Sequence, residues 1–158
     1  MGKGNNLSII FDFKEKQLEL IDNKYSKEQA KSLNSLVLAY MGDSVYESYI
    51  RLYLIKKHEG YSAHKLHIKA VNYVKAKGQS QFILYFMDKL DEEELDIFKR
   101  GRNTKTNTSP KNGSIIDYRN ATGFEALIGY LFLIGNEERI KTIFKSLIEF
   151  YHMEEEND

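Results

Sequence analysis

The sequence predicts an all-α domain, and three observations support that fold class. The chain of 158 residues has a single proline, and its aromatic residues are all tyrosine and phenylalanine. This composition favours helices over a turn-rich β fold. Apolar residues recur at intervals of three and four along most of the chain, and no segment alternates strictly between apolar and polar residues, as a half-buried strand would. We therefore predict one domain of about seven helices around a common core.

The first predicted elements are an arm and a long helical stretch. Residues 1–25 are of mixed character and are expected to form an arm or a short first element. Ser26 and Gln29 have the spacing of a capping box, so a helix is predicted to start there. Apolar positions continue at helical spacing to a polar end at His58. Because one helix of this length is long for a small domain, Gly42 is expected to mark a bend or a junction of two helices.

The remaining predicted helices are separated by glycines and by one long polar loop. Their expected ranges are 63–77, 79–90, 91–101, 118–134 and 136–153. Gly78 is expected to divide the first two, and acidic residues begin the third because negative charge stabilises a helix N-terminus. The polar loop covers residues 102–116. The domain is expected to span residues 26–153, with an acidic and frayed tail over residues 154–158.

Composition excludes several classes of function. The chain has no cysteine, which excludes disulfides, zinc–thiolate sites and cysteine nucleophiles. No apolar stretch is long enough for a signal peptide or a membrane span, so a soluble, cytoplasmic protein without a membrane partner is expected. The formal net charge is zero, which argues against coating nucleic acid by bulk charge alone. A nucleic-acid partner would need a local basic patch.

Two carboxylates, Asp43 and Glu125, lie in otherwise apolar helical runs. Burying a carboxylate without a partner costs several kcal/mol or more, so either each acid has a basic partner, for which Arg119 is a candidate, or the two share a cation. Carboxylate oxygens are the natural ligands of Mg²⁺. Such a site suits phosphodiester hydrolysis, because a metal ion lowers the pKa of bound water and stabilises the leaving oxygen. Glu47 follows Asp43 by one helical turn and shares its face.

Four segments carry a resemblance to a known family. LAYMGDSVYE, which contains Asp43, is similar to the signature helix of the ribonuclease III family. GFEALIGYLFL, which contains Glu125, is similar to the second motif of that family. KRGRNTKTNTSPKN and VNYVKAKGQ add to the likeness. Within the family, the chain most resembles the short bacterial Mini-ribonuclease III form, which lacks a double-stranded-RNA-binding domain. The resemblance covers roughly residues 33–150.

The resemblance implies an activity and its partners. It implies a ribonuclease III-type endonuclease domain that cleaves double-stranded RNA with Mg²⁺, or with Mn²⁺ in its place. For the short form, the implied substrate is precursor 23S ribosomal RNA, and a ribosomal protein is left open as a helper. The implied assembly is a homodimer whose signature helices pair across the two-fold axis. Two equivalent sites would then serve the two strands of a duplex.

The resemblance also assigns roles to individual residues. Asp43 and Glu125 would be the catalytic residues and the metal ligands. Glu47, one turn after Asp43, could lie next to these ligands or serve as a third ligand, although a solvated or interface position is favoured for it, and Thr122 could lie next to them. Full-length members of the family carry further acids at positions held here by Leu36, Ala39 and Thr122. The implied metal site is therefore a small one that water and substrate must complete.

A basic segment lies between the two acidic motifs. Residues 99–111 contain five basic residues and no acidic one. Taken alone, such a segment is a solvated loop as often as a binding site, but its place among the family motifs favours RNA. A-form RNA is recognised mainly by shape, through phosphates and 2′-hydroxyls. We predict RNA contacts from seven basic residues, namely Lys75, Lys77, Arg100, Arg102, Lys105, Lys111 and Arg119.

Alternative interpretations remain open. The same fold can serve as a catalytically inactive module that binds RNA or a protein, although the presence of both acids weighs against this. His64 and His67 have helical spacing, but without a cysteine or a third histidine nearby they are expected to lie at the surface or at the edge of the core. Tyr40 and Tyr46 flank Asp43 and are candidates for dimer contacts.

Overall fold

The computed structural model describes residues 14–21, 24–106 and 110–157, with side chains through Glu154, and these residues form helices without a strand. The elements in chain order are α2 (Lys27–Ser32), α3 (Ser35–Lys57), α4 (Ala63–Val74), α5 (Ala76–Phe86), η1 (Met87–Lys89), α6 (Glu92–Asn103), α7 (Ile115–Leu133) and α8 (Glu137–Asn157). Residues 14–21 form a further helix whose side chains are exposed. The all-α prediction is confirmed.

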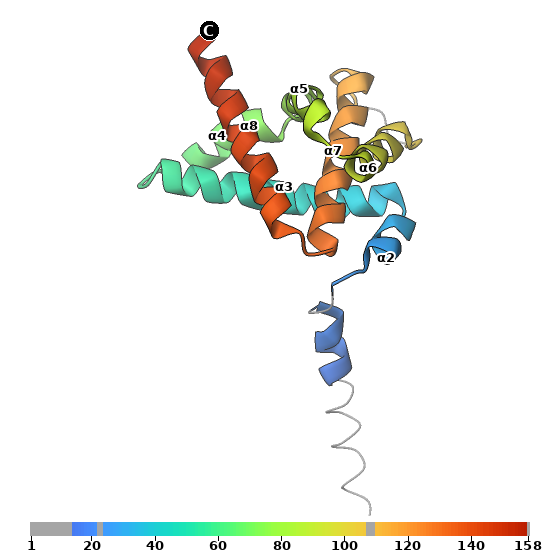
Figure 1. The fold of residues 1–158 in the computed structure, drawn as a ribbon. Coiled ribbons are helices and arrows are strands. Elements are labelled where there is room, and N and C mark those ends of the chain that lie inside the picture. The colour runs from blue at the N-terminus through green and yellow to red at the C-terminus, as the bar shows by residue number, and fades with distance from the viewer. Residues whose placement is uncertain (1–13, 22–23, 107–109, 158) are drawn as a thin grey trace, which may run out of the picture.

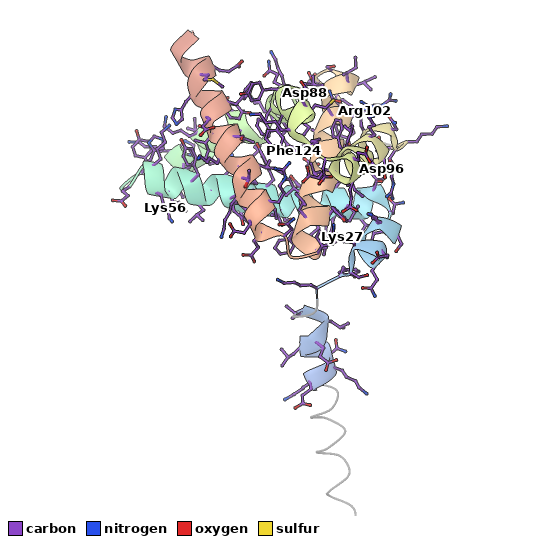
Figure 2. The ribbon with its side chains drawn as sticks, viewed as in Figure 1. Lys27, Lys56, Asp88, Asp96, Arg102 and Phe124 are labelled. Atoms are coloured by element: carbon purple, nitrogen blue, oxygen red, sulfur yellow. The ribbon has the colours of Figure 1, made fainter. Side chains whose placement is uncertain are left out.

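Helix α7 is the centre of the domain, with α3, α5 and α6 packed around it (Figure 1). Eleven of its residues are buried, as expected of a helix that is apolar on nearly all sides. Figure 2 shows Phe124 of α7 in the interior, where its side chain is fully buried. Its ring makes edge contacts with Tyr46 of α3 and Phe82 of α5, so one aromatic cluster joins three helices.

Helix α8 covers the core from the outside. Phe144 of α8 stacks on Tyr49 of α3 with ring centroids 4.7 Å apart, and Phe150 contacts Phe82 of α5. Asn136 caps this helix by accepting a hydrogen bond from the Arg139 N–H at 3.2 Å. The last helix therefore closes the same aromatic core that α7 fills from the inside.

Helices α3 and α7 cross with their backbones in contact. A Cβ atom on Gly42 would overlap the Glu125 carbonyl, and a Cβ atom on Gly129 would overlap the Leu38 carbonyl. Glycine has no Cβ and so permits this approach. The bend or junction expected at Gly42 is wrong, because α3 is a continuous helix of 23 residues. The glycine serves a contact between helices instead of a change in direction.

Two helix boundaries also lie away from their predicted places. The break after the first helix is at Leu33, whose backbone is extended, and Asn34 then caps α3 by accepting a hydrogen bond from the Leu36 N–H at 2.8 Å. The break expected at Gly78 lies at Lys75, whose extended backbone separates α4 from α5. The capping box predicted at the start of α2 is confirmed.

The ends of the chain and the polar loop show further differences. Helix α8 continues to Asn157, so the described part of the expected tail continues this helix. Helix α7 begins at Ile115 because the Ser114 side chain accepts a hydrogen bond from the Asp117 N–H at 3.3 Å. Of the expected arm, residues 1–13 and 22–23 lie outside the described residues. None of the described helices is long and apolar enough to cross a membrane.

Candidate active site

Asp43 of α3 and Glu125 of α7 meet where the two helices cross. Gly42 precedes Asp43, and its backbone lies against the backbone of Glu125. The two carboxylates are near enough for the charge of Asp43 to raise the pKa of Glu125. Asp43 is exposed, whereas Glu125 is partly buried. The crossing thus produces an acidic pair, Asp43 and Glu125, with one member facing solvent and the other set deeper.

The acidic pair carries uncompensated negative charge. Burial, together with the charge of Asp43, raises the pKa of Glu125 to about 7, and a hydrogen bond from Gln79 partly opposes that shift. Burial and the neighbouring Glu47 raise the pKa of Asp43. Neither acid forms a salt bridge within the described ranges. A basic partner for either acid, including Arg119, is therefore not found there.

Gln79 of α5 orients Glu125, a role that the sequence did not suggest. Its Nε2 donates hydrogen bonds to Glu125 Oε1 and to the Val74 carbonyl, each at 3.1 Å. The residue is only 2% exposed, and its own Oε1 has no hydrogen-bond partner among the described residues. A buried amide is normally paired. The position of Gln79 on the apolar face of its helix was therefore the sequence signal that this side chain has a polar partner inside the fold.

Glu47 and Thr122, the two other residues predicted near the acidic pair, make different contacts. Glu47 forms a salt bridge with Arg51 at 2.8 Å, and the charge of Glu47 raises the pKa of Asp43. The buried Thr122 hydroxyl donates to the Tyr118 carbonyl of its own helix at 3.0 Å. Within the described part of the chain, no three histidine or acidic side chains gather into a possible metal site. Whether Glu47 joins Asp43 and Glu125 as a ligand stays a prediction.

The chemistry of the acidic pair fits one divalent cation. Mg²⁺ is commonly held by one or two carboxylates and keeps several waters. A cation between Asp43 and Glu125 would relieve the repulsion that raises the pKa of Glu125. The exposed position of Asp43 leaves one side of such a site open to substrate and water.

The basic residues predicted to contact RNA lie in several places. Lys75 and Lys77 are exposed at the junction of α4 and α5, on the wall of a cavity. Lys105 and Lys111 are exposed in the polar loop, and Arg119 is exposed near the start of α7. These five side chains are accessible to a large polyanion.

Arg100 and Arg102 are partly engaged in the fold itself. The Arg100 guanidinium donates a hydrogen bond to the Lys31 carbonyl of α2 at 3.0 Å. Arg102 lies 5.6 Å from the ring centroid of Phe98 and donates from Nε to Asn103 at 3.2 Å. Both side chains are partly buried. Changing either one would therefore disturb local structure as well as remove charge.

Four aromatic or histidine residues singled out in the sequence are placed by the structure. Tyr40 is 80% exposed on α3, as a dimer contact requires. Tyr46 is fully buried and donates a hydrogen bond to the Tyr73 carbonyl at 2.7 Å, so the expectation that it contacts a partner is wrong. The residue before it, Val45, is also buried, so Tyr46 lies on the face of α3 that packs on the core. His64 and His67 are both exposed.

The chain is similar to known proteins over the helices that hold both acids. The family model of the ribonuclease III domain matches residues 36–136, which include both acids. The chain is 49% identical over 138 residues to Mini-ribonuclease 3 of Clostridium tetani, covering 87% of this chain and 91% of the relative. It is 53% identical over 110 residues to Mini-ribonuclease 3 of Brevibacillus brevis, covering 70% of this chain and 81% of the relative.

The fold also resembles a solved structure. A crystal structure of a Fusobacterium nucleatum protein superposes with a TM-score of 0.69 at 35% identity, covering 76% of this chain and 95% of that chain. The helices that hold the acidic pair, the family match and the relatives lead to the same assignment. The chain belongs to the ribonuclease III family, as its motifs predicted, and is an endoribonuclease of the Mini-ribonuclease 3 type.

Proposed function

We propose that this endoribonuclease cleaves double-stranded RNA with a divalent metal ion held by Asp43 and Glu125. Mg²⁺ is the proposed ion, and Mn²⁺ is its alternative. The observation that carries this proposal is the acidic pair at the crossing of α3 and α7, which has no cationic partner within the described residues. When bound, such an ion would act as a Lewis acid and stabilise negative charge at the phosphate.

The side chains of the site divide the work. Asp43 is exposed and presents its carboxylate to the substrate side. Glu125 lies deeper, and Gln79 fixes its Oε1 through a hydrogen bond of 3.1 Å, leaving Oε2 for the ion. Because the pKa of Glu125 is raised to about 7, this carboxyl must lose its proton when the site is loaded. Ion binding and proton release are thus coupled at Glu125.

The accessible cations support an RNA duplex as substrate. Lys75, Lys77, Lys105, Lys111 and Arg119 are exposed, and phosphate contacts dominate recognition of A-form RNA. Binding should therefore be strongly salt-dependent, because phosphate contacts release counterions. An affinity that stayed flat from low to moderate salt would contradict this mode of binding. On the resemblance noted in the sequence, precursor 23S ribosomal RNA in the cytoplasm is the proposed substrate, with a ribosomal protein as a candidate helper.

A homodimer is the proposed assembly, because α3 exposes apolar side chains near the acidic pair. Leu36, Val37 and Tyr40 are 38%, 49% and 80% exposed. A second copy related by a two-fold axis would cover this face and place one site for each strand of a duplex. Changing Tyr40 to Glu should shift the molecular mass measured by light scattering from dimer to monomer. A monomeric wild-type protein would contradict the dimer.

Charge removal at the acidic pair tests the function. Asp43→Asn and Glu125→Gln should each abolish cleavage of an RNA duplex in Mg²⁺, while circular dichroism and molecular mass stay unchanged. Full activity in either variant would refute the mechanism. A wild-type protein that binds the duplex in Mg²⁺ without cutting it would instead favour the catalytically inactive binding module. Mapping the ends produced from precursor 23S ribosomal RNA would test the proposed substrate.

A further inference from the structure

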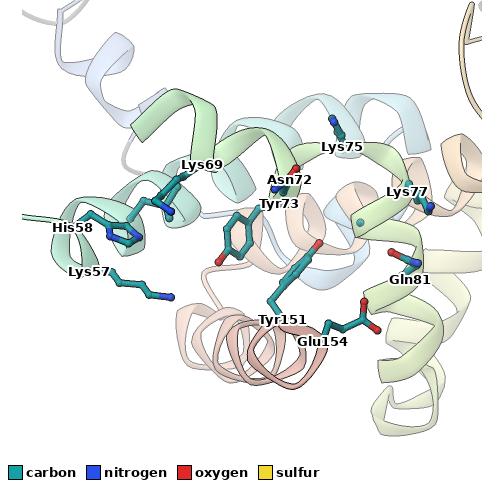
Figure 3. A pocket seen from close by; sticks show the side chains of 12 residues that line it. Lys57, His58, Lys69, Asn72, Tyr73, Lys75, Lys77, Gln81, Tyr151 and Glu154 are labelled. Atoms are coloured by element: carbon teal, nitrogen blue, oxygen red, sulfur yellow. The ribbon is translucent and has the colours of Figure 1, made fainter. Parts of the chain in front are cut away.

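We propose that a lysine-lined cavity at the junction of α4 and α5 binds backbone phosphates of the RNA strand beyond the cleaved bond. This inference rests on the proposed function and adds a second contact region to it. The cavity has a volume of about 620 Å³ and is bounded by residues of α3, α4, α5 and α8 (Figure 3). We call it the lysine cavity.

Positive charge predominates in the lysine cavity. Four lysines line it, and they come from α3, from α4, from the junction of α4 and α5, and from α5: Lys57, Lys69, Lys75 and Lys77. All four are exposed, and none forms a salt bridge with a described acid. The single lining carboxylate, Glu154, lies toward Gln81 and away from Lys57 in Figure 3. Four ammonium groups around one hollow favour a polyanion.

The walls of the lysine cavity are built by packing between helices. Tyr73 and Tyr151 face one another with ring centroids 4.6 Å apart. The Tyr151 hydroxyl lies so near Gly78 that a Cβ atom at that position would overlap it. The absence of a side chain at Gly78 therefore lets α8 dock against the start of α5. The hollow is thus held open by fixed rings, and the exposed amides of Asn72 and Gln81 on its wall suit phosphate or 2′-hydroxyl groups.

One turn of helix connects the lysine cavity to the acidic pair. Gly78 lines the cavity, and the next residue, Gln79, donates a hydrogen bond to Glu125. Gln79 also donates to the Val74 carbonyl, which precedes the cavity residue Lys75. The acidic pair and the cavity therefore lie against the same first turn of α5. The proposal places one phosphate of the strand at the acidic pair and later phosphates of the same strand at the lysine cavity.

Two lysines that were not predicted to contact RNA provide a test. The cavity variant is Lys57→Ala with Lys69→Ala, and its control is Lys56→Ala with Lys65→Ala. Both pairs remove two exposed lysines from α3 and α4. Each pair also removes one lysine that lies over a tyrosine ring, Lys57 over Tyr53 and Lys65 over Tyr61. Only the first pair lines the cavity, so the comparison separates the cavity from general surface charge.

Affinity for an RNA duplex is measured in EDTA, without cleavage, at several salt concentrations. The cavity variant should bind on the order of tenfold more weakly, and its salt slope should fall by about 2, about 1 for each lost phosphate contact. The control should keep most of both values. Equal losses in the two variants would overturn the proposal. So would an unchanged cavity variant, or a wild-type protein that binds no duplex.

A second titration uses ADP as a free nucleotide. If the cavity variant loses ADP binding but keeps full RNA affinity, the cavity serves free nucleotides and the proposal is overturned. If it loses RNA affinity, with or without ADP binding, the proposal stands. If the proposed cleavage function itself were wrong, the experiments would give a different result. In that case wild-type protein binds the duplex but does not cut it in Mg²⁺, while the salt slopes still decide the role of the cavity.

Discussion

Carboxylates in two regions of this protein meet opposite surroundings. At the start of α6, the salt bridge from Lys31 and a hydrogen bond from Tyr130 lower the pKa of Glu93 to about 2. Beside it, the buried Glu94 receives two hydrogen bonds from Arg139, at 2.6 and 2.8 Å. Glu93 and Glu94 thus each have a cation of the fold as partner.

The acidic pair shows the reverse. Glu125 has an amide as its hydrogen-bond partner and a second carboxylate as its neighbour, and its pKa is raised to about 7. Basic side chains of the protein therefore pair with Glu93 and Glu94, whereas none within the described residues pairs with Asp43 or Glu125. Leaving buried charge uncompensated destabilises a fold. This contrast supports the proposal that a cation from outside the chain binds the acidic pair.

The largest effect should come from separating the helices that create the acidic pair. Gly42→Ala places a methyl group against the Glu125 carbonyl, and overpacking of this kind costs about 3 kcal/mol or more. Alanine otherwise favours a helix by about 1 kcal/mol, so any loss comes from the collision. Urea unfolding should show the loss, and the pKa of Glu125 should fall as Asp43 moves away. Ser44→Ala, at an exposed neighbouring position, should change neither quantity.

Opposite pH dependences would sharpen the comparison. The folded-state pKa of Glu125, about 7, lies above its ordinary value of 4.5, so the native state holds this proton more tightly than the unfolded state. Metal-free protein should therefore lose stability as pH rises from about 4.5 to 7, on the order of 3 kcal/mol. Glu125→Gln should remove that loss, and Mg²⁺ should offset it in the wild type alone. Denaturant midpoints measured across this pH range provide the test.

The surface variant Glu149→Gln is the control for that pH series, because Glu149 is exposed. It should retain the wild-type loss of stability between about pH 4.5 and 7. If Glu125→Gln retained the same loss, the charge responsible would lie elsewhere, and the contrast between the two regions would fail.

Removing the amide partner should have a smaller effect. In Gln79→Leu, Glu125 loses the hydrogen bond that lowers its pKa. That pKa should therefore rise above about 7, and cleavage should slow by about 10- to 100-fold, as for other groups that orient metal ligands. Carboxyl titration by carbon NMR measures the first effect. Gln81→Leu, at an exposed position on the same helix, should leave the pKa of Glu125 unchanged. A slower enzyme with an unchanged pKa would refute the orienting role.

Features that depend on neighbouring residues could be predicted from the sequence, whereas features that depend on contacts between distant segments could not. Asp43 and Glu125 stand out because a charge inside an apolar helical run is chemically unusual, and each lies in a recognisable motif. Gly42 was misread because its role is contact with another helix, which local propensity cannot show. Gln79 has a partner 46 positions away, and nothing near it in sequence identifies that partner.

Helix boundaries were missed for a related reason. The break at Leu33 has no glycine or proline, and it depends on Asn34 capping the next helix. The break at Lys75 has no side-chain cap at all. It is defined by how α4 and α5 pack on the core, and the same packing gathers the lysine cavity from four elements. Tertiary contacts therefore decide these features, whereas residue periodicity was sufficient for the fold class.

The smallest effect should appear in the compensated region. Tyr130→Phe removes the hydroxyl that donates to Glu93 at 2.5 Å, a loss of about 1.5 kcal/mol, at the low end for a hydrogen bond to a charged group. Because the pKa of Glu93 is lowered to about 2, its contribution is present above the unfolded value near 4.5 and disappears as pH falls toward 2. The difference between wild type and Tyr130→Phe should therefore shrink with acid, opposite in direction to the effect of Glu125. The exposed Tyr85→Phe is the control, and a Tyr130 effect that did not change with pH would show that Glu93 is not its source.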